Sequence, residues 1–434
     1  MRLFMRLVRL LRPSASGNVL ILLCAMYFIT YVDRVNVASA AAAFKSELGL
    51  TNTELGLAFS AFGYPYLVFQ VAGGWFGDRF GARWTLAICG VVWATATILT
   101  GLVGSLATLI AARVLLGFGE GATFPVATRA MASWLPGEKA GFAQGITHAS
   151  ARIGNAITPP LVVGLMALIT WRGSFVVIGL ISLIWAIVWA WYFRDDPRAH
   201  RGIQPHELTD LPKPRVRGVR PQVPWRKLSR RMAPVIFVYF CYGWTLWTFL
   251  SWLPQFMLHQ YNLKLSDSAL FSSLVFFGGV IGDALGGFVS DWLLRRTGSL
   301  RRARRDLVIF GMAGSLASSL PILFLHSPLA AALCLSLTFF FAELTIGPMW
   351  AIPMDIAPQF AGTASGLMNT GSALAAILSP LIFGVVIDQT GSWTLPFVGT
   401  MGLMLIGLIT AFAMRPELRF DTGTESPKVA SAIA

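Results

Sequence analysis

The sequence alternates between long apolar runs and short polar connections along most of its length. Twelve of these runs are long enough to cross a bilayer as helices. They cover residues 18–41, 55–76, 83–103, 105–130, 142–167, 173–193, 233–258, 269–294, 306–325, 328–353, 363–387 and 393–414. The pattern predicts an all-α integral membrane protein with twelve transmembrane helices, arranged as two six-helix bundles.

The polar stretches between the runs predict how the chain is divided. A proline-rich, basic linker covers residues 194–232, with six runs before it and six after it. We therefore expect five segments: a basic N-terminal segment at 1–17, an N-terminal bundle at 18–193, the linker at 194–232, a C-terminal bundle at 233–414 and a polar tail at 415–434.

A short charged motif follows the second run of each half. The first copy reads GWFGDRFGAR from Gly74 to Arg83, and a degenerate copy reads GFVSD from Gly287 to Asp291. The repeat predicts a parallel duplication of one six-helix unit. Glycines permit close packing, aspartate caps helices and arginine prefers headgroups. We expect a conformational gate made of Gly74, Asp78, Arg79, Gly81, Arg83 and Asp291.

Composition and charge identify the surroundings of the chain. Hydrophobic residues make up 55% and charged residues only 12%, whereas soluble domains carry about 25% charged residues. The net charge is +14, but lysine and arginine concentrate in alternate loops, the linker and both terminal segments. By the positive-inside rule, this predicts a bacterial inner-membrane protein with both termini in the cytoplasm. The partner is the lipid bilayer, and nucleic acid is excluded.

The sequence offers no catalytic or metal-binding pattern. The four cysteines all fall inside apolar runs without ligand spacing, which favours core packing over disulfides or a metal site. Of the five histidines only His148 lies well within a run, and no Ser-His-Asp pattern accompanies it. We expect no cofactor, no metal and no enzymatic activity.

Four charged residues lie deep inside the first and fourth runs, where each marks a functional site by default. Asp33 and Arg34 are neighbours and must point in different directions. We expect one to face a cavity and the other the fourth span, although they can also form a neutral pair. Arg113 and Glu120 lie seven residues apart on one helical face. Glu120 is either a proton carrier or a static partner of Arg113.

The fifth run carries His148 and Arg152, one turn apart on the same face. No acid lies one turn from Arg152 in its own helix. Together with Arg34 it offers two fixed positive charges to an anion, and guanidinium suits carboxylate, phosphate or sulfonate groups. We expect His148 to bind the substrate beside Arg152. The alternatives are that Asp33 or Glu120 neutralises Arg152, and that His148 makes only a helix contact.

The second half is poorer in charge. Asp283 and Glu343 are its ionisable exceptions, while aromatic and small polar residues dominate the seventh, tenth and eleventh runs. We expect an asymmetric site, in which the first half supplies charge and the second supplies shape and hydrogen bonds.

These residues give the chain a family resemblance. Gly74 to Arg83 resembles the loop 2–3 motif of the major facilitator superfamily. Further motifs resemble its anion:cation symporter group of phthalate, tartrate and sugar-acid permeases, sialin and vesicular glutamate carriers. These motifs are YVDRVN at 31–36, Arg113 with Gly117 and Glu120, Phe124-Pro125, and SWLP at 251–254. The resemblance implies the major facilitator fold.

The resemblance also implies roles for individual residues. Arg34 would bind a substrate carboxylate, and Asp33 and Glu120, with Arg113, would carry out proton coupling. The residues that would line the pocket are Tyr31, Tyr66, Trp350 and Asn369. Ala151 stands where sugar-acid permeases have a hydroxyl-binding glutamine, and Arg152 follows it. A pocket with fewer hydroxyl partners and more positive charge favours a dicarboxylate or a sulfonated carboxylate such as sulfoacetate.

The function that these expectations favour is import of a small organic anion by proton symport, with sodium as the less favoured coupling ion, by a protein that acts as a monomer. Uptake of hexuronate, aldonate or glucarate is the first alternative. An exporter of the same fold is the second, and it predicts few arginines in the cavity. A sensor without transport activity would normally carry a soluble signalling domain, which the sequence lacks.

Overall fold

A computed structural model describes residues 14–135, 140–211 and 223–420 of the chain. Within these ranges the regular structure is helical, without strands. The helices of the first half are α2 (Ala15–Ser39), α3 (Ala41–Leu48), α4 (Asn52–Ala61), α5 (Gly63–Phe80), α6 (Ala82–Thr100), α7 (Leu106–Gly121), α8 (Thr123–Trp134) and α9 (Ala140–Tyr192). The linker contains η2 (Pro197–Ala199) and α10 (Pro205–Asp210).

The second half repeats this plan. Its helices are α11 (Trp225–Gln260), α12 (Leu265–Thr297), η3 (Arg301–Asp306), α13 (Leu307–Ser319), η4 (Leu320–Leu323), α14 (Pro328–Leu344), α15 (Ile346–Ile356), η5 (Pro358–Phe360), α16 (Ala361–Thr390) and α17 (Leu395–Ala411).

The helices form the twelve crossings that the apolar runs predict. Nine helices of the described residues are long and apolar enough to span a membrane, and Leu395–Ala411 is a shorter apolar helix. One of the nine, α9, contains two crossings, because its backbone leaves the helical conformation at Ile169 and Thr170. The pair α4–α5 supplies the remaining crossing. The predicted fold class is therefore confirmed.

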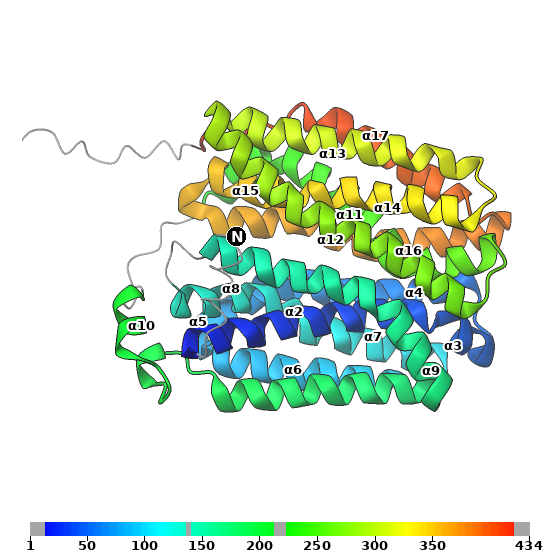
Figure 1. Cartoon of the computed structure of the whole chain (residues 1–434), viewed down its shortest axis with the longest axis horizontal. Coiled ribbons are helices and arrows are strands. Elements are labelled where there is room, and N and C mark those ends of the chain that lie inside the picture. Colours follow the sequence, from blue (N-terminus) through cyan, green and yellow to red (C-terminus); the bar gives the residue numbers. More distant parts are fainter. Residues whose placement is uncertain (1–13, 136–139, 212–222, 421–434) are drawn as a thin grey trace, which may run out of the picture.

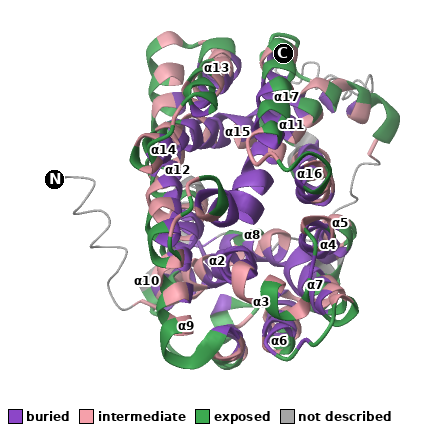
Figure 2. Cartoon of the chain, turned by 90° about the vertical axis from the view of Figure 1, so that its right-hand side faces the viewer, coloured by how far each residue is buried: buried purple, intermediate pink, exposed green. Residues whose placement is uncertain are grey.

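The two halves lie side by side as separate bundles (Figure 1). Helices α2 to α9 form one bundle and α11 to α17 the other, and the linker with α10 lies at one end, called here the linker end. The opposite end, which faces the viewer in Figure 2, is called the far end. Large apolar side chains such as Leu168, Trp191 and Phe324 are exposed. Such a surface suits lipid, where every backbone group must find its partner within the helices.

The halves meet through α4 and α5 against α16, α9 against α12, and α2 against α11. At the far end, Asp388 of α16 accepts hydrogen bonds from the backbone amides of Asn52 and Thr53, at the start of α4. A Cβ atom at Gly56 would overlap the carbonyl oxygen of Pro380. Glycine therefore lets α4 and α16 touch along their backbones. These contacts hold the two halves together at the far end.

The far end of the first half is fixed by an ion pair outside the apolar spans. Arg172, in the turn inside α9, lies 2.7 Å from Glu47 of α3, and Trp171 donates to the same carboxylate. These hydrogen bonds lower the pKa of Glu47. The carboxylate thus stays charged and holds α3 against α9.

Candidate functional site

Arg34 forms a buried ion pair within the first half. Its Nε donates to Oε2 of Glu120 in α7 at 2.7 Å, and the side chains are 3% and 0% exposed. The structure thus places Arg34 against the fourth span, one of the two orientations expected. It also pairs Glu120 with Arg34, whereas sequence spacing favoured Arg113. Both charges lie deep in the bundle, where a lone charge would be very costly.

Aromatic rings surround the Arg34 guanidinium group. Its central carbon lies between 4.8 and 5.8 Å from five ring centroids, those of Tyr31, Phe62, Tyr66, Phe124 and Trp247. Four of these rings belong to the first half, and Trp247 belongs to α11 of the second. Ring faces attract a cation and exclude water from it. The cage therefore holds Arg34 in place beside the boundary between the halves.

Asp33 points away from Arg34, as their adjacent positions predict. Its two carboxyl oxygens accept hydrogen bonds from Thr97 of α6 at 3.0 Å and Ser182 of α9 at 3.2 Å. Asp33 thus contacts α6 and α9 through hydroxyl groups, and its exposure to a substrate cavity stays a prediction. The two neighbours do not form the neutral pair that was the alternative.

Arg113 lies near this cluster. It is 3% exposed, and its guanidinium carbon is 5.3 Å from the centroid of the Phe62 ring, which also lies against Arg34. Arg113 therefore adds a positive charge close to the ion pair of Arg34 and Glu120.

Arg152 forms a second ionic cluster that crosses from one half to the other. Its Nε donates to Asp283 of α12 at 3.3 Å, and its Nη2 lies 2.9 Å from Oε2 of Glu343 in α14. Tyr242 of α11 donates to the other oxygen of Glu343 at 2.9 Å. The acids that neutralise Arg152 therefore come from the second half, and the alternative that named Asp33 or Glu120 is wrong for this state.

The two arginines contact the same tyrosine ring. The guanidinium carbons of Arg34 and Arg152 lie 4.8 and 5.5 Å from the centroid of Tyr31. Nη2 of Arg34 and Nη1 of Arg152 are buried and lack a hydrogen-bond partner among the described residues. Buried donors without acceptors are rare in folded proteins. Both arginines therefore offer unused hydrogen-bond donors. This arrangement suits a molecule with an anionic group at each end.

The remaining predicted pocket residues lie around this centre. The His148 ring lies 5.5 Å from that of Tyr27 and 6.0 Å from that of Trp350. Trp350 donates to the hydroxyl of Tyr239 at 3.0 Å. Asn369 is half-buried in α16. Trp350 thus joins His148 of the first half to the aromatic residues of α11, and Asn369 stays a predicted ligand.

Asp283, Glu343, Tyr242 and Trp247 contribute to the site, although sequence reasoning gave them no role in it. Charge balance is the signal that could have found the two acids. Away from the ends of its spans, the first half holds three arginines and two acids, whereas the second half holds Asp283 and Glu343 alone. Since buried charges must be paired, the surplus arginine and the two acids had to meet across the boundary.

The first gate motif lies at the linker end. Gly81 joins α5 to α6 with φ of +82°, a conformation that favours glycine. Asp195 of the linker accepts from the amides of Ala82 and Arg83 and so caps α6. Arg83 also donates to the carbonyl of Ala190. Arg79 ends α5 with an exposed side chain, and the side chains of residues 74 and 78 lie outside the described ones.

The second motif makes a comparable cluster. Arg304 of η3 lies 3.4 Å from Asp291 and 3.0 Å from Asp355 at the end of α15. It thus ties α12, η3 and α15 together. These contacts lie within one half, and gating by both motifs stays a prediction.

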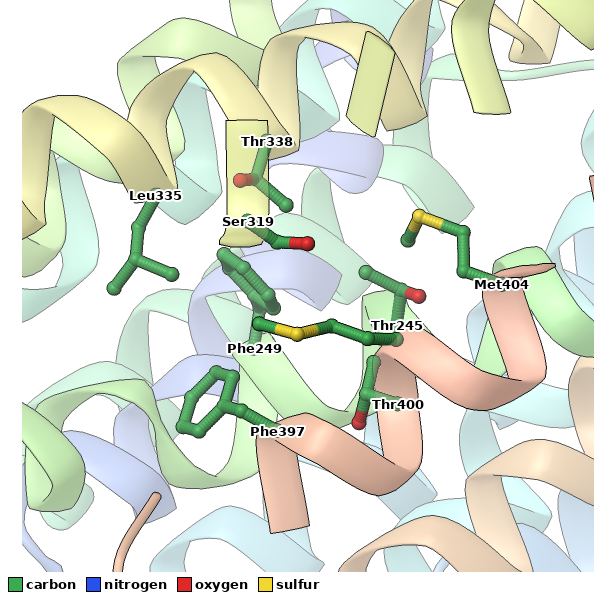
Figure 3. A pocket seen from close by; sticks show the side chains of 9 residues that line it. Thr245, Phe249, Ser319, Leu335, Thr338, Phe397, Thr400 and Met404 are labelled. Atoms are coloured by element: carbon green, nitrogen blue, oxygen red, sulfur yellow. The ribbon is translucent and has the colours of Figure 1, made fainter. Parts of the chain in front are cut away.

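A small cavity lies inside the second half, apart from the arginines (Figure 3). Its volume is about 10 Å³, roughly the size of one water molecule. Three of its hydroxyl groups, those of Ser319, Thr338 and Thr400, donate to carbonyls of their own helices. Their methyl and methylene groups therefore face the cavity, and this space suits side-chain packing and no solute.

A family model supports the fold. The model described as Major Facilitator Superfamily matches residues 23–380, which include most of both bundles. The chain belongs to the Major Facilitator Superfamily. This membership confirms the resemblance that the loop 2–3 motif indicates.

Similar proteins of the superfamily include transporters of organic anions. The chain is 44% identical over 417 residues to the "Probable sulfoacetate transporter SauU" of Cupriavidus necator, covering 95% of this chain and 97% of that protein. It is 30% identical over 387 residues to the "D-galactonate transporter" of Escherichia coli, covering 84% and 89%.

Solved structures share the superfamily fold. The bacterial homologue of the human lysosomal transporter Spinster, in an inward-facing and unoccupied conformation, aligns with a TM-score of 0.77 at 15% identity. The alignment covers 95% of this chain and 100% of that one. At this identity the likeness supports the arrangement of the helices alone.

Proposed function

We propose that this protein is a proton-coupled importer of a small organic dianion in the bacterial inner membrane. The observation that carries the proposal is the pair of arginines in contact with the ring of Tyr31, each with a buried donor that lacks an acceptor. Arg34 would hold one anionic group and Arg152 the other. Rocking of the two bundles around this centre would move the anion across the membrane, and the chain would act as a monomer.

A sulfonated carboxylate such as sulfoacetate fits this site best. It carries a carboxylate and a sulfonate on one small carbon unit, and guanidinium binds both groups through paired hydrogen bonds. The 44% identity to a protein named as a sulfoacetate transporter supports this choice. The aromatic cage around Arg34 has few polar atoms for the hydroxyl groups of a sugar acid.

The distribution of positive charge supports an orientation of the protein in the membrane. The arginine clusters of η3 and of the linker lie at the linker end. The positive-inside rule therefore favours the linker end as the cytoplasmic one. The contact between Asp388 and the start of α4 would then close the site to the outside.

Proton coupling follows from the buried acids. Burial disfavours a charged carboxylate, and a neighbouring arginine favours it. When the substrate takes Arg34, Glu120 loses its partner and needs a proton. Asp33, whose partners are hydroxyl groups, would carry a second proton. Each net positive charge that moves inward gains about 2.3 kcal/mol per 100 mV of membrane potential.

Uptake into proteoliposomes tests this function. We expect sulfoacetate to accumulate when protons are more concentrated outside, and an uncoupler to abolish the accumulation. Glu120→Gln should still exchange labelled for unlabelled sulfoacetate but should not accumulate it. Uncoupler-sensitive uptake of D-galactonate alone would support the sugar-acid alternative, and no uptake or exchange of either anion would contradict the proposal.

A further inference from the structure

The buried charges at the centre of the molecule do not balance. The described spans place three arginines there, Arg34, Arg113 and Arg152, against four acids, Asp33, Glu120, Asp283 and Glu343. Apart from Arg152, the first half is balanced, with two arginines against two acids. The surplus negative charge lies in the cluster of Arg152, Asp283 and Glu343, which the proposed coupling through Asp33 and Glu120 does not use.

Glu343 forms a buried ion pair with Arg152 in this state. Its Oε1 accepts from the hydroxyl of Tyr242, its Oε2 lies 2.9 Å from Nη2 of Arg152, and the side chain is 0% exposed. Oε2 makes no hydrogen bond among the described residues, so the negative charge of the carboxylate is balanced by the ion pair with Arg152. The titratable and charged groups around it are Arg152 from α9, Asp283 from α12 and Tyr242 from α11, and Tyr239 stacks on Tyr242.

Binding of a dianion would change these surroundings. An anionic group that takes Arg152 removes the only cation facing Glu343 among the described residues. The carboxylate would then stand buried beside Asp283 and the substrate, both negatively charged. Such an unpaired buried charge is strongly disfavoured, and a proton on the carboxyl group removes it.

We propose that Glu343 is a third proton-carrying carboxyl group, ionised while it pairs with Arg152 and protonated while the substrate holds Arg152. The inference rests on the proposed function, because it needs a dianion at Arg152. The proton enters with the substrate from outside, resides on a carboxyl oxygen of Glu343, and leaves to the cytoplasm when Arg152 returns to Glu343.

Asp283 is a weaker candidate for this role. Its side chain is 11% exposed, and its contact with Arg152 is longer, at 3.3 Å. Partial hydration reduces the cost of leaving a carboxylate charged. Glu343, the fully buried partner of Arg152, is therefore the group whose protonation must change.

Three carrier carboxyl groups change the energetics of the whole cycle. Two protons with a dianion move no net charge, and the membrane potential cannot drive such a cycle. Three protons with a dianion move one positive charge inward. The inference therefore predicts a measurable quantity, the charge moved with each substrate molecule.

The test uses the purified full chain in proteoliposomes. Sulfoacetate is tenfold more concentrated inside, pH is equal on both sides, and potassium with valinomycin sets the membrane potential. For a net charge of one, an inside-negative potential of about 59 mV stops the net efflux caused by a tenfold gradient. We expect this value for the unmodified protein. Glu343→Gln should continue to exchange sulfoacetate, but no potential should stop its efflux.

Two further variants distinguish the effect of losing the charge of Glu343 from the effect of disturbing the structure around it. Glu47→Gln makes the same chemical change in the exposed ion pair with Arg172 and should keep the value of the unmodified protein. Tyr242→Phe removes the hydrogen bond to Glu343 but no charge, so it should keep that value even if transport slows.

The outcomes distinguish this inference from the proposed function. Transport by the unmodified protein that does not respond to potential would overturn the third proton and leave proton-coupled uptake intact. A response to membrane potential that Glu343→Gln retains would also overturn the third proton and leave proton-coupled uptake intact. If Glu343→Gln does not fold, the unmodified protein still decides the inference. Absence of any sulfoacetate transport by the unmodified protein would instead overturn the proposed function.

Discussion

Arg34 and Arg152 are chemically alike, but they are held in different ways. Arg34 pairs with Glu120 of its own bundle inside a cage of five rings. Arg152 pairs with Asp283 and Glu343 of the opposite bundle. The first pair can therefore move as part of one rigid bundle, whereas the second must break or rearrange when the bundles separate.

This difference assigns different tasks to the two sites. A fixed arginine suits tight binding, because its position costs little to organise when the anion arrives. An arginine that bridges two bundles couples the anion to the motion between them. We therefore expect substitutions at Arg34 to affect binding of every anion, and substitutions at Arg152 to affect dianions and conformational coupling.

The largest effect should come from Arg34→Ala. Removing one partner of a buried ion pair costs about 3–5 kcal/mol, since it leaves the other charge unpaired. Affinity for sulfoacetate should fall by at least about 100-fold, measured by isothermal titration calorimetry. Arg34→Lys serves as the control because it keeps the charge but loses the paired hydrogen bonds, and its affinity should be intermediate. Undiminished affinity of Arg34→Ala would contradict this role.

Arg152→Gln should have a smaller and more selective effect. A hydrogen bond to a charged group contributes about 1.5–3 kcal/mol, so sulfoacetate should bind about 10–100-fold more weakly. Acetate, which has one charged group, should keep its affinity within about threefold of the unmodified protein. Competition binding with both anions measures the ratio.

The control for this variant is Arg152→Gln combined with Glu343→Gln, which removes both charges of one pair. The two proteins should show the same selectivity. An equal loss for acetate and sulfoacetate in both would mean that Arg152 does not distinguish dianions.

The smallest effect should come from the far end, where the halves meet without an arginine. Asp388→Asn removes the negative charge of a carboxylate that accepts three hydrogen bonds from Asn52 and Thr53. A hydrogen bond contributes about 0.5–1.5 kcal/mol, so the population open at the far end should rise about 2–10-fold. Labelling of Ser60→Cys, with the four native cysteines replaced by alanine, measures this opening. An unchanged labelling rate would mean that Asp388 does not close the far end.

The fold was predictable because lipid imposes simple rules on the chain. A span must be apolar and about twenty residues long, so hydropathy alone defines the twelve crossings. The repeated motif after the second run of each half indicates the duplication, and the break at Ile169 and Thr170 falls between two predicted runs. Exact helix ends were less predictable, since caps such as Asp195 on α6 come from distant segments.

The site was only partly predictable. Sequence spacing correctly set Asp33 and Arg34 on different faces of α2. It could not choose partners, because Glu120 lies on one helical face with Arg113 and yet contacts Arg34 from another helix. The proposed role of Glu343 depends on its ion pair with Arg152 of another helix, and no spacing within one helix contains that information.

Binding of sulfoacetate and of its two halves, acetate and methanesulfonate, to the unmodified protein tests the central claim most directly. If Arg34 and Arg152 bind opposite ends of one dianion, sulfoacetate should bind at least about 100-fold more tightly than either fragment, because the second group binds at no further cost in translational freedom. A sulfoacetate affinity equal to that of the better fragment would mean that one arginine alone binds the anion, and it would contradict the two-arginine site.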